Sequence, residues 1–207
     1  MGRDKQAVVF RNSLIVSCQD NAQWTTRMAL DGGCGGLRLN GPKDVKIARL
    51  MSRDIPIVAC WKEKVHGYAI YITPMPDQVQ TLADAGADII AFDATARKRP
   101  TPVKVMVDTI HNAGCLAMAD IKNAEEGIAA SEAGADYIAT TLNPCLNPEL
   151  VSTLKSALLG KTIVDEGSVW SPEDAKASLK AGADFVCVGS AITRPHEITR
   201  KFVEAIK

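Results

Sequence analysis

Three copies of one tetrapeptide decide the fold: Ala85-Gly86-Ala87-Asp88, Ala133-Gly134-Ala135-Asp136 and Ala181-Gly182-Ala183-Asp184. Consecutive copies lie 48 residues apart, from Asp88 to Asp136 and from Asp136 to Asp184. Each copy follows an amphipathic, helix-like stretch and precedes an apolar, strand-like one. A long repeat of this kind indicates copied supersecondary units. Because one βα unit of a small barrel takes roughly 25 residues, the spacing fits two units per period.

The rest of the chain continues this alternation. Helical patterns cover residues 77–85, 102–113, 124–133 and 172–181, and a last helix is expected over 195–206. Nearly continuous apolar strands that alternate with helices argue for a parallel sheet buried on both faces, and eight units close into an α/β (β/α)8 TIM barrel. An open doubly wound sheet is the alternative, but no Gly-x-Gly-x-x-Gly turn follows the first strand. The expected strands are 14–18, 36–40, 56–61, 89–93, 116–120, 137–142, 162–166 and 185–189.

Length and composition favour one domain. The chain has 207 residues, 46% of them apolar, which suffices for one well-filled core. We therefore expect a single barrel domain over residues 1–207, with 1–13 as a leading segment. Residues 69–74 look like a ninth strand, but Pro74 and Pro76 interrupt regular pairing. We expect this segment to form an ordered loop over the barrel mouth.

Charge and cysteine patterns exclude several classes of protein. Lys plus Arg and Asp plus Glu both number 24, and no basic tract indicates a nucleic-acid partner. No apolar run of about 18 residues could span a membrane, and the charged N-terminus is unlike a signal peptide. The six cysteines form no CxxC pair and the three histidines are scattered, so we expect no metal site and no disulfide. Buried reduced thiols fit a cytoplasmic protein.

Polar residues end nearly every expected strand. In a (β/α)8 barrel the active site lies at the C-terminal ends of the strands, so the repeated aspartates at the opposite end are expected to be turn and cap residues. A ring with one Lys, one Arg, two Asp and one Glu indicates more than helix capping. The ring comprises Gln19, Arg38, Asn40, Lys62, Asp93, Thr95, Asp120, Thr140, Thr141, Glu166, Gly167, Ser168, Gly189 and Ser190.

The last two strands end in Gly167-Ser168 and Gly189-Ser190. In many barrels the loops after strands 7 and 8 bind phosphate through backbone N–H groups, which glycine allows to approach the anion closely. The pair of Gly-Ser turns at these positions predicts a phosphate site. Arg194 could add a charged contact or cap the last helix, and the residues leave both interpretations open.

Lys62 and Glu166 end strands on opposite sides of the ring. Racemisation or epimerisation by two bases needs one group to remove a proton α to a carbonyl and another to deliver one to the opposite face. Lys62 could instead form a salt bridge with Asp93 or Asp120 that closes the barrel mouth. Glu166 could simply hydrogen-bond the backbone of a neighbouring strand. Spacing alone does not separate these interpretations.

In their order along the chain, these segments resemble the N-acetylmannosamine-6-phosphate 2-epimerase family, barrels of the ribulose-phosphate-binding type. The resemblance runs from about Leu14 to the C-terminus. Its most specific parts are Gly36-Leu37-Arg38-Leu39-Asn40-Gly41 and Ile192-Thr193-Arg194-Pro195. It implies an isomerase that interconverts N-acetylmannosamine 6-phosphate and N-acetylglucosamine 6-phosphate in sialic acid catabolism, without a cofactor and as a homodimer.

The resemblance also implies roles for individual residues. Lys62 matches the proton-abstracting lysine, Glu166 the second acid/base, and Asp93 the carboxylate that orients the lysine. Arg38 could also stabilise an enolate-like intermediate electrostatically. We expect substrate binding by Gln19, Arg38, Thr140 and Asp120, and phosphate binding by Gly167, Ser168, Gly189, Ser190 and Arg194.

Several loop positions depart from the family pattern. Ser168 stands where the family usually has Arg, and Glu63 replaces an Arg after Lys62. Asn143-Pro144-Cys145 replaces a Ser-Gly-Tyr segment, and the connection at 20–26 is short. Two other functions therefore stay open. One is a lyase, aldolase or other isomerase on a different phosphosugar, for example with a Schiff base on Lys62, and the other is a non-catalytic phosphosugar-binding barrel.

Overall fold

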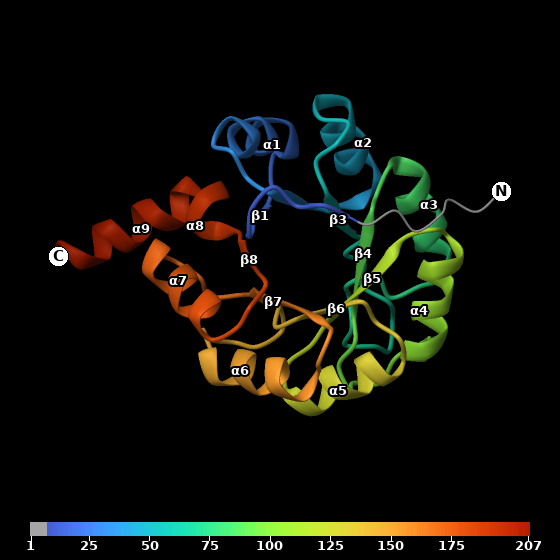
Figure 1. Cartoon of the computed structure of the whole chain (residues 1–207). Helices are drawn as coiled ribbons and strands as arrows, with labels where there is room; N and C mark the ends of the chain where they lie inside the picture. Colours follow the sequence, from blue (N-terminus) through green and yellow to red (C-terminus); the bar gives the residue numbers. More distant parts are fainter. Residues whose placement is uncertain (1–7) are drawn as a thin grey trace.

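A computed structural model describes residues 8–207 and confirms the (β/α)8 barrel (Figure 1). Eight parallel strands follow one another around the ring, and β8 pairs with β1 to close it. Part of the expected leading segment, residues 1–7, lies outside the described residues. The strands are β1 (Leu14–Ser17), β2 (Gly36–Asn40), β3 (Ile57–Cys60), β4 (Ile89–Asp93), β5 (Leu116–Asp120), β6 (Tyr137–Ala139), β7 (Thr162–Glu166) and β8 (Phe185–Val188).

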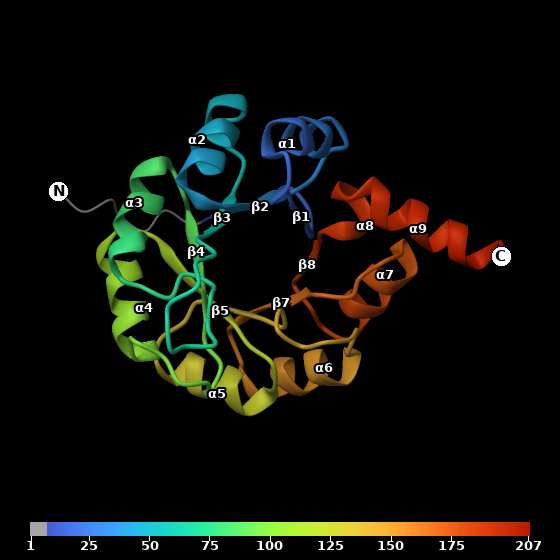
Figure 2. The same ribbon diagram turned by 180° about the vertical axis from the view of Figure 1, so that it is seen from behind.

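Helices surround the strands on the outside (Figures 1 and 2). The expected last helix starts at Pro195, but a separate helical turn, α8, precedes it. Within residues 8–207, no helix combines the length and the apolar character that crossing a membrane requires. The helices are α1 (Ala22–Asp31), α2 (Gly41–Met51), α3 (Asp77–Ala85), α4 (Val103–Asn112), α5 (Ala124–Glu132), α6 (Pro148–Ala157), α7 (Pro172–Lys180), α8 (Ser190–Thr193) and α9 (Pro195–Ala205).

The repeated tetrapeptides lie at the N-terminal end of the barrel, which we call the floor. Each glycine has a positive φ, between 100° and 107°, where a left-handed residue ends a helix. Each aspartate then accepts a hydrogen bond from a backbone N–H of the preceding strand: Asp88 from Ile57 at 2.9 Å, Asp136 from Ala117 at 2.8 Å and Asp184 from Ile163 at 2.7 Å. These bonds join neighbouring strands at the floor.

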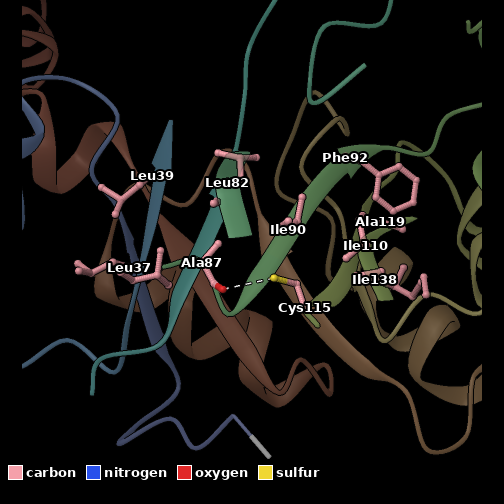
Figure 3. Close-up of a cluster of buried hydrophobic side chains, with 14 of the residues drawn as sticks. Leu37, Leu39, Leu82, Ala87, Ile90, Phe92, Ile110, Cys115, Ala119 and Ile138 are labelled. Atoms are coloured by element: carbon pink, nitrogen blue, oxygen red, sulfur yellow. Dashed lines mark hydrogen bonds between the residues drawn. The ribbon is translucent and has the colours of Figure 1, made fainter. Parts of the chain in front are cut away.

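Alternating side chains divide the core into two layers, because successive strand residues point to opposite faces. One set lies between strands and helices and includes Leu37, Ile90 and Phe92 (Figure 3). The other set fills the barrel interior and includes Val58 and Met118. The same alternation decides which polar residues at the C-terminal end, the mouth, point inward.

One segment departs from the regular barrel. The segment expected as a loop over the mouth, residues 69–74, instead inserts between β3 and β4. Ile72 forms an isolated antiparallel bridge with Lys62, and its carbonyl accepts the N–H of Asp93 at 2.9 Å. Thr73 N–H donates to the Trp61 carbonyl at 2.8 Å. The two strands therefore pair directly only near the floor and separate at the mouth.

Candidate active site

The centre of the mouth is a buried cluster of one guanidinium and two carboxylates. Arg38 is 1% exposed and forms a two-pronged ion pair with Asp120, with Nη2–Oδ2 at 2.5 Å and Nη1–Oδ1 at 3.1 Å. Arg38 Nη1 also donates to Glu166 Oε2 at 2.5 Å. Thr141 Oγ1 donates to Asp120 Oδ1 at 2.6 Å. Bidentate charged hydrogen bonds fix orientation as well as charge, so Arg38 is held rigidly beneath the mouth.

The charges in this cluster do not balance, and this affects Glu166. Burial raises the pKa of Glu166, the Arg38 guanidinium opposes that rise, and Asp120 adds to it. Burial alone would lower the pKa of Arg38, but Asp120 and Glu166 hold it above its ordinary range. Arg38 therefore stays charged, whereas Glu166 keeps its proton to a higher pH than an ordinary glutamate. A carboxyl group of this kind can donate a proton.

Lys62 lies above this cluster and is exposed to a cavity of about 180 Å³ that Glu166 also lines. Its backbone N–H donates to Asn40 Oδ1 at 2.8 Å, which ties the end of β3 to β2. Within residues 8–207, Lys62 forms no ion pair with Asp93 or Asp120. The salt-bridge interpretation of Lys62 is therefore not seen, and the residue lines the cavity instead.

Asp93 is engaged elsewhere. It is 1% exposed, and its Oδ1 accepts bonds from Thr95 N–H at 3.0 Å and Thr95 Oγ1 at 2.7 Å. Its Oδ2 pairs with Arg97. The expected contact that would orient Lys62 is absent from the described part of the chain. The inserted segment explains this, because Ile72 lies between the ends of β3 and β4.

Thr140 also points away from the cavity. β6 ends at Ala139 rather than continuing to residue 142, because the N–H of Asn143 turns back to the Thr140 carbonyl at 2.9 Å. Thr140 is 2% exposed, and its hydroxyl donates to Asp165 on the outer side of β7 at 2.6 Å. Its neighbour Thr141 lines the cavity instead. Counting the alternation from Ala139, an inward residue, would have predicted Thr141 from sequence.

The expected phosphate-binding residues follow the neighbouring strands β7 and β8 and line the same cavity. Gly167 and Ser168 both have positive φ, 100° and 58°, so the chain turns sharply after β7. Arg194 ion-pairs with Asp20, and its Nη1 donates to Ser190 Oγ at 3.3 Å. The cavity is lined here by Gly167, Ser168, Gly189, Ser190 and Arg194.

Sequence reasoning missed some residues that line this cavity. Ser17 and Cys187 follow the inward alternation of β1 and β8, so their positions could have been predicted from the strand register. Gln19, which was predicted, donates to Ser17 Oγ at 2.9 Å. Trp170 and Thr193 come from loop and helix and carry no such signal.

The cysteines in the described part of the chain are free thiols, and Cys145 alone among them is exposed. Burial raises the pKa of Cys60 to about 11 and holds that of Cys187 well above its ordinary range. Both thiols stay protonated beside the Arg38 cluster. Among residues 8–207, no group of three or more His, Cys, Asp or Glu side chains could hold a metal ion.

Known proteins resemble the chain in both sequence and structure. Residues 25–207 match the family described as "Putative N-acetylmannosamine-6-phosphate epimerase". A Yersinia pseudotuberculosis protein named "Putative N-acetylmannosamine-6-phosphate 2-epimerase" is 38% identical over 95% of this chain and 91% of its own length. The solved structure of the N-acetylmannosamine-6-phosphate 2-epimerase from Clostridium perfringens has a TM-score of 0.89 and 35% identity, covering 96% of this chain and 94% of that chain.

A more distant structure shows the fold alone. Deoxyribose phosphate aldolase from Aeropyrum pernix has a TM-score of 0.66 at 17% identity, covering 91% of this chain and 88% of that chain. The family match and the 38% identical relative go further, because each covers most of the chain. The chain belongs to the N-acetylmannosamine-6-phosphate epimerase family.

Proposed function

We propose that this protein epimerises N-acetylmannosamine 6-phosphate to N-acetylglucosamine 6-phosphate at C2, in amino-sugar and sialic acid catabolism. One observation carries the proposal. Lys62 and Glu166 line the same cavity from opposite sides of the barrel, and the expected phosphate-binding turns after β7 and β8 line it too. The reaction as proposed uses side chains for both proton transfers and needs no cofactor.

The chemistry begins with the proton at C2, which is α to the C1 carbonyl of the open-chain sugar. Lys62, acting as the base, takes this proton, and the electron pair of the C–H bond moves into an enolate. The charged Arg38 does not line the cavity but pairs with Glu166, which does, and we assign it the electrostatic stabilisation of the developing negative charge. Return of a proton to the opposite face gives the epimer. Glu166 is our candidate for this second step, because burial raises its pKa.

The phosphate group would occupy the other end of the cavity. There the backbone of Gly167, Ser168 and Gly189 and the charge of Arg194 lie within reach of an anion. Ser168 carries no charge, so Arg194 would be the cation of this site. Its ion pair with Asp20 holds the guanidinium at the rim. We therefore assign phosphate binding to Gly167, Ser168, Gly189, Ser190 and Arg194.

Proton NMR in heavy water tests this proposal. N-acetylmannosamine 6-phosphate should convert to its epimer with deuterium at C2, because the abstracted proton exchanges with solvent. Borohydride with substrate should leave Lys62 unmodified; a covalent adduct on Lys62 would support a Schiff-base lyase or aldolase instead. Unchanged conversion in Lys62→Ala would reject Lys62 as the base.

We also propose that the protein is a homodimer joined by α9. None of the residues of α9 is buried, although Phe202 and Ile206 are apolar and 68% and 81% exposed. The helix points away from the barrel (Figures 1 and 2). Beside α8 lies an apolar groove of about 540 Å³, lined in part by Leu14, Leu179 and Val186. Exchange of α9 between two copies would fill each groove with an apolar helix.

Analytical ultracentrifugation tests this dimer. Phe202→Asp introduces a charge on the apolar side of α9, so a monomer is expected. Arg200→Asp places an aspartate two residues away, on the opposite side of the helix, and should leave the dimer intact. A dimeric Phe202→Asp variant would contradict the exchange. The buried reduced thiols favour the cytoplasm as the location of the protein.

A further inference from the structure

A buried polar relay lies behind β7, on the side of the strand that faces α7 rather than the cavity. Its members are Ser178, Asp165 and Thr140, and we call it the β7 relay. Asp165 Oδ2 accepts a short hydrogen bond from Ser178 Oγ on α7. Asp165 Oδ1 accepts a bond from Thr140 Oγ1 at 2.6 Å. All three side chains are buried, at 0–2% exposed.

A carboxylate at this position is unusual for this barrel. On other strands, the residue before an inward polar group packs against the helices and is apolar: Leu37 precedes Arg38, Phe92 precedes Asp93 and Ala119 precedes Asp120. Asp165 holds the corresponding place before Glu166. Burying a carboxylate is costly unless other groups satisfy it, and within residues 8–207 its side-chain partners are hydroxyls rather than cations. This cost calls for a role at this position.

The direction of the hydrogen bonds indicates that role. A threonine hydroxyl has one proton to donate. Thr140 Oγ1 is 2.6 Å from Asp165 Oδ1 and 3.2 Å from the Glu166 carbonyl, so the proton goes to Asp165. The lone pairs of Thr140 then face the backbone N–H of Glu166, which donates to Thr140 Oγ1 at 3.0 Å. Asp165 thus determines which way the Thr140 hydroxyl points.

We propose that the β7 relay positions Glu166, fixing the last residue of β7 so that its carboxyl group faces the cavity and Arg38. The relay links α7 to the end of β6 and then to the backbone of Glu166. Thr140 and Asp165 are positioning residues, since neither touches the cavity. This inference rests on the proposed function, in which Glu166 acts on substrate bound above it. A displacement of about 1 Å in such a group can cost about 100-fold in rate.

Substitutions at Thr140 separate positioning from simple packing. Thr140→Val keeps the shape but removes the hydroxyl, so kcat should fall by up to about 100-fold while KM changes little. Thr140→Ser keeps the hydroxyl and should restore kcat close to the wild-type value. Thr26→Val is the matched control, because it removes an equally buried hydroxyl on α1, outside the relay, and should leave kcat unchanged. Asp165→Asn provides a second test if Thr140→Val does not fold.

A measurement on the ligand-free protein keeps this inference separate from the proposed reaction. Carbon-13 NMR follows the titration of the Glu166 carboxyl group. Breaking the relay should give Glu166 more contact with water, so its pKa should move down toward the ordinary range in Thr140→Val and Asp165→Asn, but not in Thr140→Ser. If the wild-type protein had no epimerase activity, the proposed function would be wrong. The titration of Glu166 would still test the β7 relay, because it does not depend on activity. Unchanged titrations in Thr140→Val and Asp165→Asn, or equal losses of kcat in Thr140→Ser and Thr140→Val, would overturn the inference.

Discussion

The floor and the mouth of the barrel both place carboxylates beside basic side chains, but the number of carboxylates for each basic side chain differs. On the floor, each repeated aspartate has its own partner: Arg49 pairs with Asp88, His111 with Asp136 and Lys155 with Asp184. The aspartates there are 27–36% exposed. At the mouth, Asp120 and Glu166 share one guanidinium, that of Arg38, and are 0% and 12% exposed.

We interpret this difference as a division of roles, in which the floor aspartates stabilise the fold and the mouth cluster serves the proposed reaction. Each floor aspartate accepts a strand N–H and pairs with one basic side chain of its own, so no two of these aspartates share a partner. The same arrangement recurs three times because every copied unit needs it. The mouth cluster occurs once and leaves one carboxylate in excess. Burial raises the pKa of Glu166 there, and the neighbouring Asp120 adds to that rise. In our proposal, the repeated groups stabilise the fold and the shared guanidinium marks the reactive site.

The largest expected effect is the loss of the base. Lys62→Ala should reduce kcat by about 10²–10⁴-fold, the usual contribution of a positioned general acid or base. The fold should persist, because the side chain is exposed to the cavity. Lys64→Ala removes a lysine two residues away on the exposed loop and should keep full activity. A Lys62→Ala variant with near-normal kcat would show that the reaction does not depend on Lys62.

Removing the shared cation should have the next largest effect. Arg38→Met leaves the buried carboxyl groups of Asp120 and Glu166 without their cation. Breaking a buried ion pair costs about 3–5 kcal/mol in the free energy of unfolding. Lys155→Met breaks a half-exposed pair on the floor and should cost about 0–1 kcal/mol. Urea denaturation of both variants measures the contrast. Equal losses would mean that burial does not distinguish the two ends.

The floor aspartates should affect stability without affecting catalysis. Asp136→Ala leaves the Ala117 N–H and His111 without their partner, and an unsatisfied group of this kind costs about 1–3 kcal/mol. We expect a lower Tm with unchanged kcat and KM at a temperature where the variant is folded. A reduced kcat in the fully folded variant would show that the floor takes part in the reaction.

The smallest effect concerns pH. Because the pKa of Glu166 lies above its ordinary value, the folded protein binds more protons than the unfolded chain between those two values. Stability from neutral Glu166 is therefore lost as pH rises through that window. Glu166→Gln cannot ionise, so its Tm relative to wild type should rise with pH across the window. A difference in Tm that stays constant or falls would show that the environment of Glu166 does not disfavour its charge.

Much of the fold could be predicted because it depends on local patterns. Gly86, Gly134 and Gly182 mark helix ends, and apolar runs mark strands, so the eight-stranded order followed from spacing. The inserted segment at 69–74 could not be predicted, because its pairing depends on where β3 and β4 separate in space. The same insertion explains why Asp93 does not contact Lys62. Tertiary contacts, rather than local propensity, decide these features.

The candidate site was predictable to a similar extent. The residue types at the strand ends followed from the register, and Lys62, Gln19 and Glu166 do line one cavity. Thr140 was expected in the cavity because the strand was extended to residue 142 and its alternation was not counted. The sharing of Arg38 between Asp120 and Glu166 needed three strands to be placed together. No sequence spacing contains that information.

The most direct test of the division between mouth and floor is deuterium incorporation at C2 of N-acetylmannosamine 6-phosphate in heavy water. The rate should be compared by proton NMR in wild type, Lys62→Ala and Asp136→Ala. We predict that wild type and Asp136→Ala incorporate label at equal rates, while Lys62→Ala incorporates almost none. Epimerised product without label, or equal incorporation by Lys62→Ala, would contradict the account.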